Sequence, residues 1–110
     1  MSYAVSGSTI TMTRGDTFSA SVVIHNPDGS EYRPKTGDKV RFAVKKKVSD
    51  SNVLLIKNIP ISTMKLVIEP NDTKMLEFGK YIYDMQLTTA EGVVDTFITT
   101  ATLNITEEVD

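Results

Sequence analysis

Apolar residues recur at every second position along most of this chain, and no other feature constrains its fold as strongly. In KVRFAVK, residues 39–45, Val40, Phe42 and Val44 alternate with Lys39, Arg41 and Lys45. A strand with one buried and one exposed face gives this period, because successive side chains point to opposite faces. The pattern predicts an all-β core of Ile10, Met12, Phe18, Val22, Ile24, Val40, Phe42, Val44, Leu66, Ile68, Leu76, Tyr81, Tyr83, Met85, Leu87, Phe97, Leu103 and Ile105.

Turn-forming sequences separate the alternating runs. They are NPDGS (26–30), PKTGD (34–38), VSDSN (48–52), PNDT (70–73) and TAEG (89–92). Strand starts therefore recur roughly every 10–15 residues, a spacing typical of antiparallel sandwiches and barrels. With 110 residues the chain suits one domain. We predict an immunoglobulin-like antiparallel β-sandwich of about seven strands, forming a single domain over residues 1–110.

Two segments depart from simple alternation. NDTKMLEFG, residues 71–79, predicts one short helical turn, with Asp72 or Thr73 as the cap, Gly79 as the stop, and Met75, Leu76 and Phe78 packed. VLLIKNIPI, residues 53–61, predicts a strand that begins buried on both sides and ends, or lies at an edge, near Pro60. Because outward apolar residues in excess often mark interfaces, this strand supplies our candidate contact surface: Leu54, Leu55, Ile56 and Ile59.

A glycine precedes Tyr81 by two residues in FGKYIYDMQLT, residues 78–88. In immunoglobulin-like sandwiches a tyrosine in such a place bonds through its hydroxyl to backbone across the turn. We predict that role for Tyr81, against the alternative that it is simply a core aromatic residue.

The triplet Arg14-Gly15-Asp16 has two interpretations. It lies between two alternating runs, where Gly15 can take positive φ and Asp16 can bond nearby backbone, so a turn explains it fully. A tight exposed turn would also display an adhesive tripeptide to a receptor. We favour the turn and keep Arg14, Gly15 and Asp16 as the less favoured receptor-binding candidate.

The residues offer little for catalysis. The single histidine, His25, follows a strand beside a turn, the chain has no cysteine, and no serine lies in a nucleophile elbow. PDGSE (27–31) and SDSN (49–52) faintly resemble calcium loops, but turn chemistry explains both. We therefore predict that the protein is not an enzyme and has no catalytic residues, metal or cofactor.

Charge and hydropathy give further expectations. The net charge is −2 and the pI is near 5.3, which disfavours nucleic acid and anionic membranes as partners. We interpret the one basic cluster, Lys45–Lys47, as a strand end whose lysines discourage aggregation rather than as a phosphate site. MSYAVSGSTI, residues 1–10, lacks the basic and apolar regions of a secretion signal, so we expect a protein that is made in the cytoplasm and carries no secretion signal.

The order of the segments resembles small structural domains of phages and prophages of Gram-positive bacteria. ITMTRGDTFSASVVI is followed by TGDKVRFAVKKK and then by IEPNDTKMLEFGKYIYDMQLTTAEGVVDTFITTATLNITEEV. The turns and strand cores of these segments are similar to the N-terminal-domain family of the baseplate upper protein of lactococcal phages. The resemblance spans Ile10 to Val109 and carries no catalytic motif.

That resemblance implies a β-sandwich that serves as a virion part and assembles with other virion proteins. Self-association is compatible with it, and position in the baseplate, tail, neck or capsid decoration stays open. The chain ends at Asp110 without the coiled coil or receptor-binding segments of a full baseplate protein, so we expect a stand-alone protein or a domain of a longer one. The alternative function is a carbohydrate or cell-surface receptor-binding module, which the lack of tryptophan and the 7% aromatic content disfavour.

Overall fold

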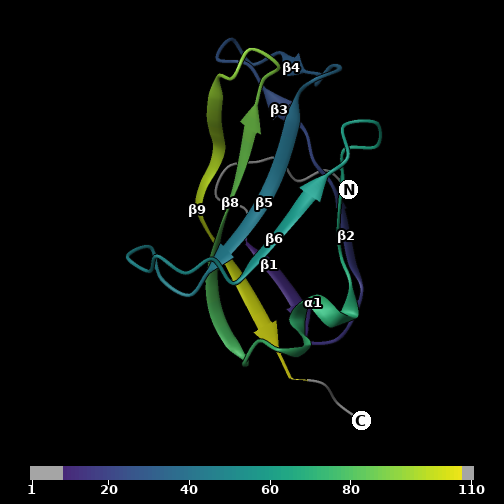
Figure 1. Ribbon diagram of the computed structural model, residues 1–110. Helices are drawn as coiled ribbons and strands as arrows, with labels where there is room; N and C mark the ends of the chain where they lie inside the picture. Colours follow the sequence, from purple (N-terminus) through teal and green to yellow (C-terminus); the bar gives the residue numbers. More distant parts are fainter. Residues whose placement is uncertain (1–8, 108–110) are drawn as a thin grey trace.

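Strands dominate the computed structural model, which describes residues 9–107 (Figure 1). They account for 52% of these residues and helix for 5%, which confirms the predicted all-β fold. The elements are β1 (Ile10–Thr13), β2 (Phe18–Ser21), β3 (Ile24–His25), β4 (Glu31–Tyr32), β5 (Lys39–Lys45), β6 (Leu55–Ile59), β7 (Lys65–Ile68), α1 (Pro70–Lys74), β8 (Gly79–Thr88) and β9 (Val94–Thr106).

The larger sheet has the strand order β1–β9–β8–β5–β6. Its ladders are antiparallel except that β1 runs parallel to β9, from Ile10 opposite Leu103 to Thr13 opposite Thr106. The sheet is therefore mixed, which corrects the expectation of a purely antiparallel fold. The reason is that the chain leaves the sheet after β1 and joins β7 through β2, so β1 and β9 can end at the same end of the molecule.

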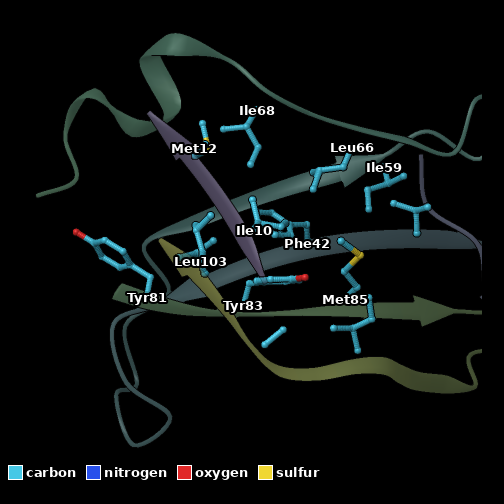
Figure 2. Packing of buried hydrophobic residues seen from close by; sticks show 14 of the residues in the cluster. Ile10, Met12, Phe42, Ile59, Leu66, Ile68, Tyr81, Tyr83, Met85 and Leu103 are labelled. Atoms are coloured by element: carbon cyan, nitrogen blue, oxygen red, sulfur yellow. The ribbon is translucent and has the colours of Figure 1, made fainter. Parts of the chain in front are cut away.

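The second layer consists of two small antiparallel sheets, β2–β7 and β3–β4. The described residues form nine strands rather than about seven, because β2 and β3 are separated by Val22 and Val23 and β4 has two residues. The core lies between the layers (Figure 2), giving a sandwich-like arrangement. Near its centre Phe42 and Tyr83 come from adjacent strands, with ring centroids 5.1 Å apart.

Every predicted core residue is buried except Phe18 and Phe97, which are half-buried against the core. The prediction for this part of the chain is wrong by one position: Ile98, and not Phe97, is the fully buried residue. Opposite β8, the register of β9 slips by one residue between Tyr83 and Met85 and again between Met85 and Gln86. Each extra residue in a bulge moves the following side chains to the other face.

Strand β6 lies at one end of the larger sheet and stops immediately before Pro60, as predicted. Lys57 lies opposite the buried Phe42 in the ladder, and its Nζ lies 2.9 Å from Oδ2 of Asp72 in α1. An inward-pointing charged side chain on an edge strand opposes pairing of that edge with another chain. This ion pair therefore bridges β6 to α1, and its lysine disfavours pairing of another chain with the β6 edge of the sheet.

A buried carboxylate, Asp38, joins three segments next to the start of β5. Strand β5 starts at the opposite end of the molecule from α1 (Figure 1). It accepts hydrogen bonds from the Tyr32 hydroxyl at 2.5 Å and from the backbone amides of Lys35 and Ala90, both at 3.1 Å. The hydroxyl and the amides lower the pKa of the Asp38 carboxyl, and the same hydroxyl contact raises the pKa of Tyr32. The sequence predicted only a turn at residues 34–38, because an aspartate in a turn gives no sign that its carboxylate is buried.

Candidate interaction surface

The predicted contact strand divides into exposed and buried residues. The exposed fractions of Leu54 and Ile56 are 44% and 56%, whereas Leu55 is half-buried against the core. Ile59 is 2% exposed and is a core residue, so its assignment to a contact surface was wrong. Alternation resumes within β6 and turns Ile59 inward, opposite Val40.

Leu54 lies beside two exposed apolar residues from a distant segment. Met75 and Phe78, in the connection between α1 and β8, are 89% and 46% exposed, so of the three apolar residues expected to pack at this turn only Leu76 is buried. With Leu54 they line a hollow of about 300 Å³, together with Lys46, Leu76, Glu77 and Tyr81. We call Leu54, Met75 and Phe78 the apolar patch.

Helix α1 fixes the start of the segment that carries Met75. Pro70 occupies the first turn, and Glu69 and Asp72 form a capping box in which Asp72 Oδ2 accepts from the Glu69 amide at 2.7 Å. Leu76 donates its amide to the Thr73 carbonyl at 2.9 Å and inserts its side chain into the core. The predicted short helical turn is confirmed, but its cap is Glu69 rather than Asp72 or Thr73. The turn ends at Lys74, before Gly79, and Met75 is directed into solvent.

Two side chains hold the carbonyl groups of the same segment. Arg14 Nη1 donates to the Leu76 carbonyl at 3.4 Å, and the Tyr81 hydroxyl donates to the Glu77 carbonyl at 2.7 Å. The second bond confirms the turn-bridging role predicted for Tyr81, whose hydroxyl points away from the other labelled core residues (Figure 2). Burial raises the pKa of the Tyr81 phenol.

A cation stacks on the ring of Phe78, within the patch, and another on the ring of Tyr81, beside it. The Arg14 guanidinium carbon lies 4.9 Å from the centroid of the Phe78 ring, and Lys46 Nζ lies 4.4 Å from that of Tyr81. Lys46 also donates to the Lys80 carbonyl at 2.9 Å. These contacts stabilise the positions of the Phe78 and Tyr81 rings next to Met75.

The Arg14-Gly15-Asp16 triplet forms the turn between β1 and β2, as favoured from the sequence. Gly15 has φ of +84° and donates its amide to Thr73 Oγ1 at 2.9 Å, while the Asp16 amide donates to the Thr13 carbonyl at 3.1 Å. Arg14 is half-buried and engaged with Leu76 and Phe78. The triplet thus supports the apolar patch, a role that no local sequence signal indicates.

The other sequence candidates lie apart from the patch or belong to turns. His25 is exposed at the end of β3. Asp28 accepts from the Ser30 hydroxyl at 2.6 Å and from the Ser30 amide at 2.9 Å, and these two bonds lower the pKa of Asp28. Over residues 9–107, no group of three or more histidine, aspartate or glutamate side chains is arranged to hold a metal ion.

Two further hollows lie elsewhere in the described part of the chain. One, of about 240 Å³, opens on the outer face of the larger sheet, where Arg41 and Asp84 form an ion pair at 3.5 Å. The other, of about 400 Å³, lies beside Tyr32 and Met64. The exposed large apolar residues of the first hollow come from a single loop, and the second hollow has none. Of these three hollows, only the one at the apolar patch is lined by exposed large apolar residues from two separate segments of the chain.

No protein-family model matches this chain, and no curated protein matches it in sequence. Among the residues that the structure describes, none of the helices is long and apolar enough to cross a membrane.

Proposed function

We propose that this chain is a non-enzymatic structural module of a phage or prophage particle, in the tail or baseplate, where it assembles with other virion proteins. The order of its turns and strand cores, from Ile10 to Val109, supports the phage assignment. The apolar patch supports the assembly role.

The observation that carries the assembly role is the exposure of Met75 on a rigid support. Met75 is a large apolar residue that is 89% exposed, and its contact with a partner molecule would remove this apolar surface from water, which is favourable. Its neighbours are already ordered by the bonds to the Leu76 and Glu77 carbonyls, so little further ordering is needed on binding. Repetition around a particle axis would let modest contacts add.

Mass spectrometry of particles purified from an induced culture of the source strain tests this proposal. We expect the chain at a fixed ratio to the major capsid protein; a ratio near one indicates decoration, and a much lower ratio indicates tail, neck or baseplate. Absence from well-purified particles would overturn the structural role. It would favour the carbohydrate or receptor-binding alternative, which a glycan array then examines directly.

A further inference from the structure

We propose that the apolar patch receives an acidic segment of a partner protein, with one large apolar side chain of that segment inserted between Leu54, Met75 and Phe78. This inference rests on the proposed assembly role and adds the chemistry of the partner. It follows from the charge around the hollow, from the shape of the hollow and from the character of its lining.

Lysines outnumber carboxylates among the residues at and next to the hollow, although the whole chain carries a net charge of −2. Lys46 and Glu77 are the charged residues that line it, and Lys47, Lys74 and Lys80 adjoin lining residues in the chain, where no further carboxylate does. Arg14 adds a further cation against Phe78. Complementary potentials steer encounter and reject partners of the same sign, so an acidic segment fits this rim.

The size of the hollow suits a side chain rather than a larger ligand. Its volume of about 300 Å³ lies at the lower end of the range of roughly 300–1,000 Å³ for small-molecule pockets. Binding energy at protein interfaces is concentrated in a few large side chains that fill such pockets and exclude water. Met75 is unbranched and adaptable, so it can close over an aliphatic or an aromatic insert.

A lipid surface would also combine apolar and cationic contacts, but the geometry favours a protein segment. Membrane-surface binding requires apolar side chains that project from a convex face into the bilayer. Here Leu54 and Phe78 are each more than half buried and border a hollow.

Selection from a displayed library of short random peptides against the full chain tests the inference. We expect enriched peptides with a leucine, methionine or aromatic residue flanked by aspartate or glutamate. Their binding should weaken at least about tenfold in Met75→Asp, and weaken further as salt rises to about 0.5 M. Val93→Asp is the matched control, because Val93 is 61% exposed in the hairpin at the other end of the molecule (Figure 1).

Three results would overturn the inference. They are neutral or basic enriched peptides, peptides that bind Met75→Asp as well as the unaltered chain, and failure to enrich any peptide sensitive to Met75→Asp. Binding to vesicles containing phosphatidylglycerol that is lost in Met75→Asp would assign the patch to lipid instead. None of these results bears on the presence of the chain in particles, so the proposed function stands or falls separately.

Discussion

At the scale of single residues, both the backbone and the surroundings of Gly37 oppose a side chain. Its φ is +96°, and a Cβ built there would lie 2.7 Å from Ala90 Cβ. Gly92 has a similar φ of +92° but open space around it. We expect Gly37→Ala to lower the free energy of unfolding by roughly 2–4 kcal/mol and Gly92→Ala by about 1–2 kcal/mol. Urea denaturation measures both, and equal losses would show that the contact with Ala90 is unimportant.

Asp38 predicts how stability depends on pH. Its pKa in the folded chain lies below the ordinary value of 3.8, so the unfolded chain binds a proton more readily in this range. The stability that Asp38 contributes is therefore complete above pH 3.8 and is lost as the pH falls through the folded pKa. In urea titrations below pH 5, Asp38→Asn should show a lower midpoint and a smaller acid-induced decline than the unaltered chain. An unchanged decline would assign acid sensitivity to other carboxyls, such as Asp72.

At the scale of elements, one hydroxyl joins α1 to the β1–β2 turn. Thr73 is fully buried, and its Oγ1 accepts the Gly15 amide. Thr73→Val keeps the shape but leaves that amide without its acceptor, so we expect a loss of about 1–3 kcal/mol in unfolding free energy. Thr73→Ser keeps the hydroxyl and is the control. Amide hydrogen exchange at Gly15 should accelerate in the valine variant only, and equal protection in both would contradict this role.

The alternation of apolar residues predicted the strands well because burial of one face imposes period two directly on the sequence. The alternation failed in β9, where the register against β8 shifts twice and Ile98 is buried in the core in place of Phe97. A threonine run, TT at residues 99–100, gives no sign that Thr100 adopts a positive φ of 53°. A bulge depends on the partner strand, so local composition cannot reveal it.

At the scale of the whole molecule, the candidate surface could be recognised only from the fold. Leu54 was identified as an outward apolar residue, but its neighbours Met75 and Phe78 belong to a segment more than twenty positions away in the sequence. The local pattern favoured packing both of them, as it correctly did for Leu76. Which of three nearby apolar residues enters the core is decided by the end of α1 and by the anchors on the Leu76 and Glu77 carbonyls.

The proposed assembly role and this arrangement together give the last prediction. Met75 is 89% exposed, so Met75→Asp should leave the denaturation midpoint nearly unchanged while placing a carboxylate in the contact that we propose. In a prophage lacking the native copy, we expect particles complemented by Met75→Asp to contain several-fold less of this chain, and those complemented by Val93→Asp to contain the normal amount. Leu55, half-buried against the core, is unsuitable for this test, because a charge there would disturb folding. Normal incorporation of a stably folded Met75→Asp chain would show that the patch is not the assembly contact, even if the chain is a virion part.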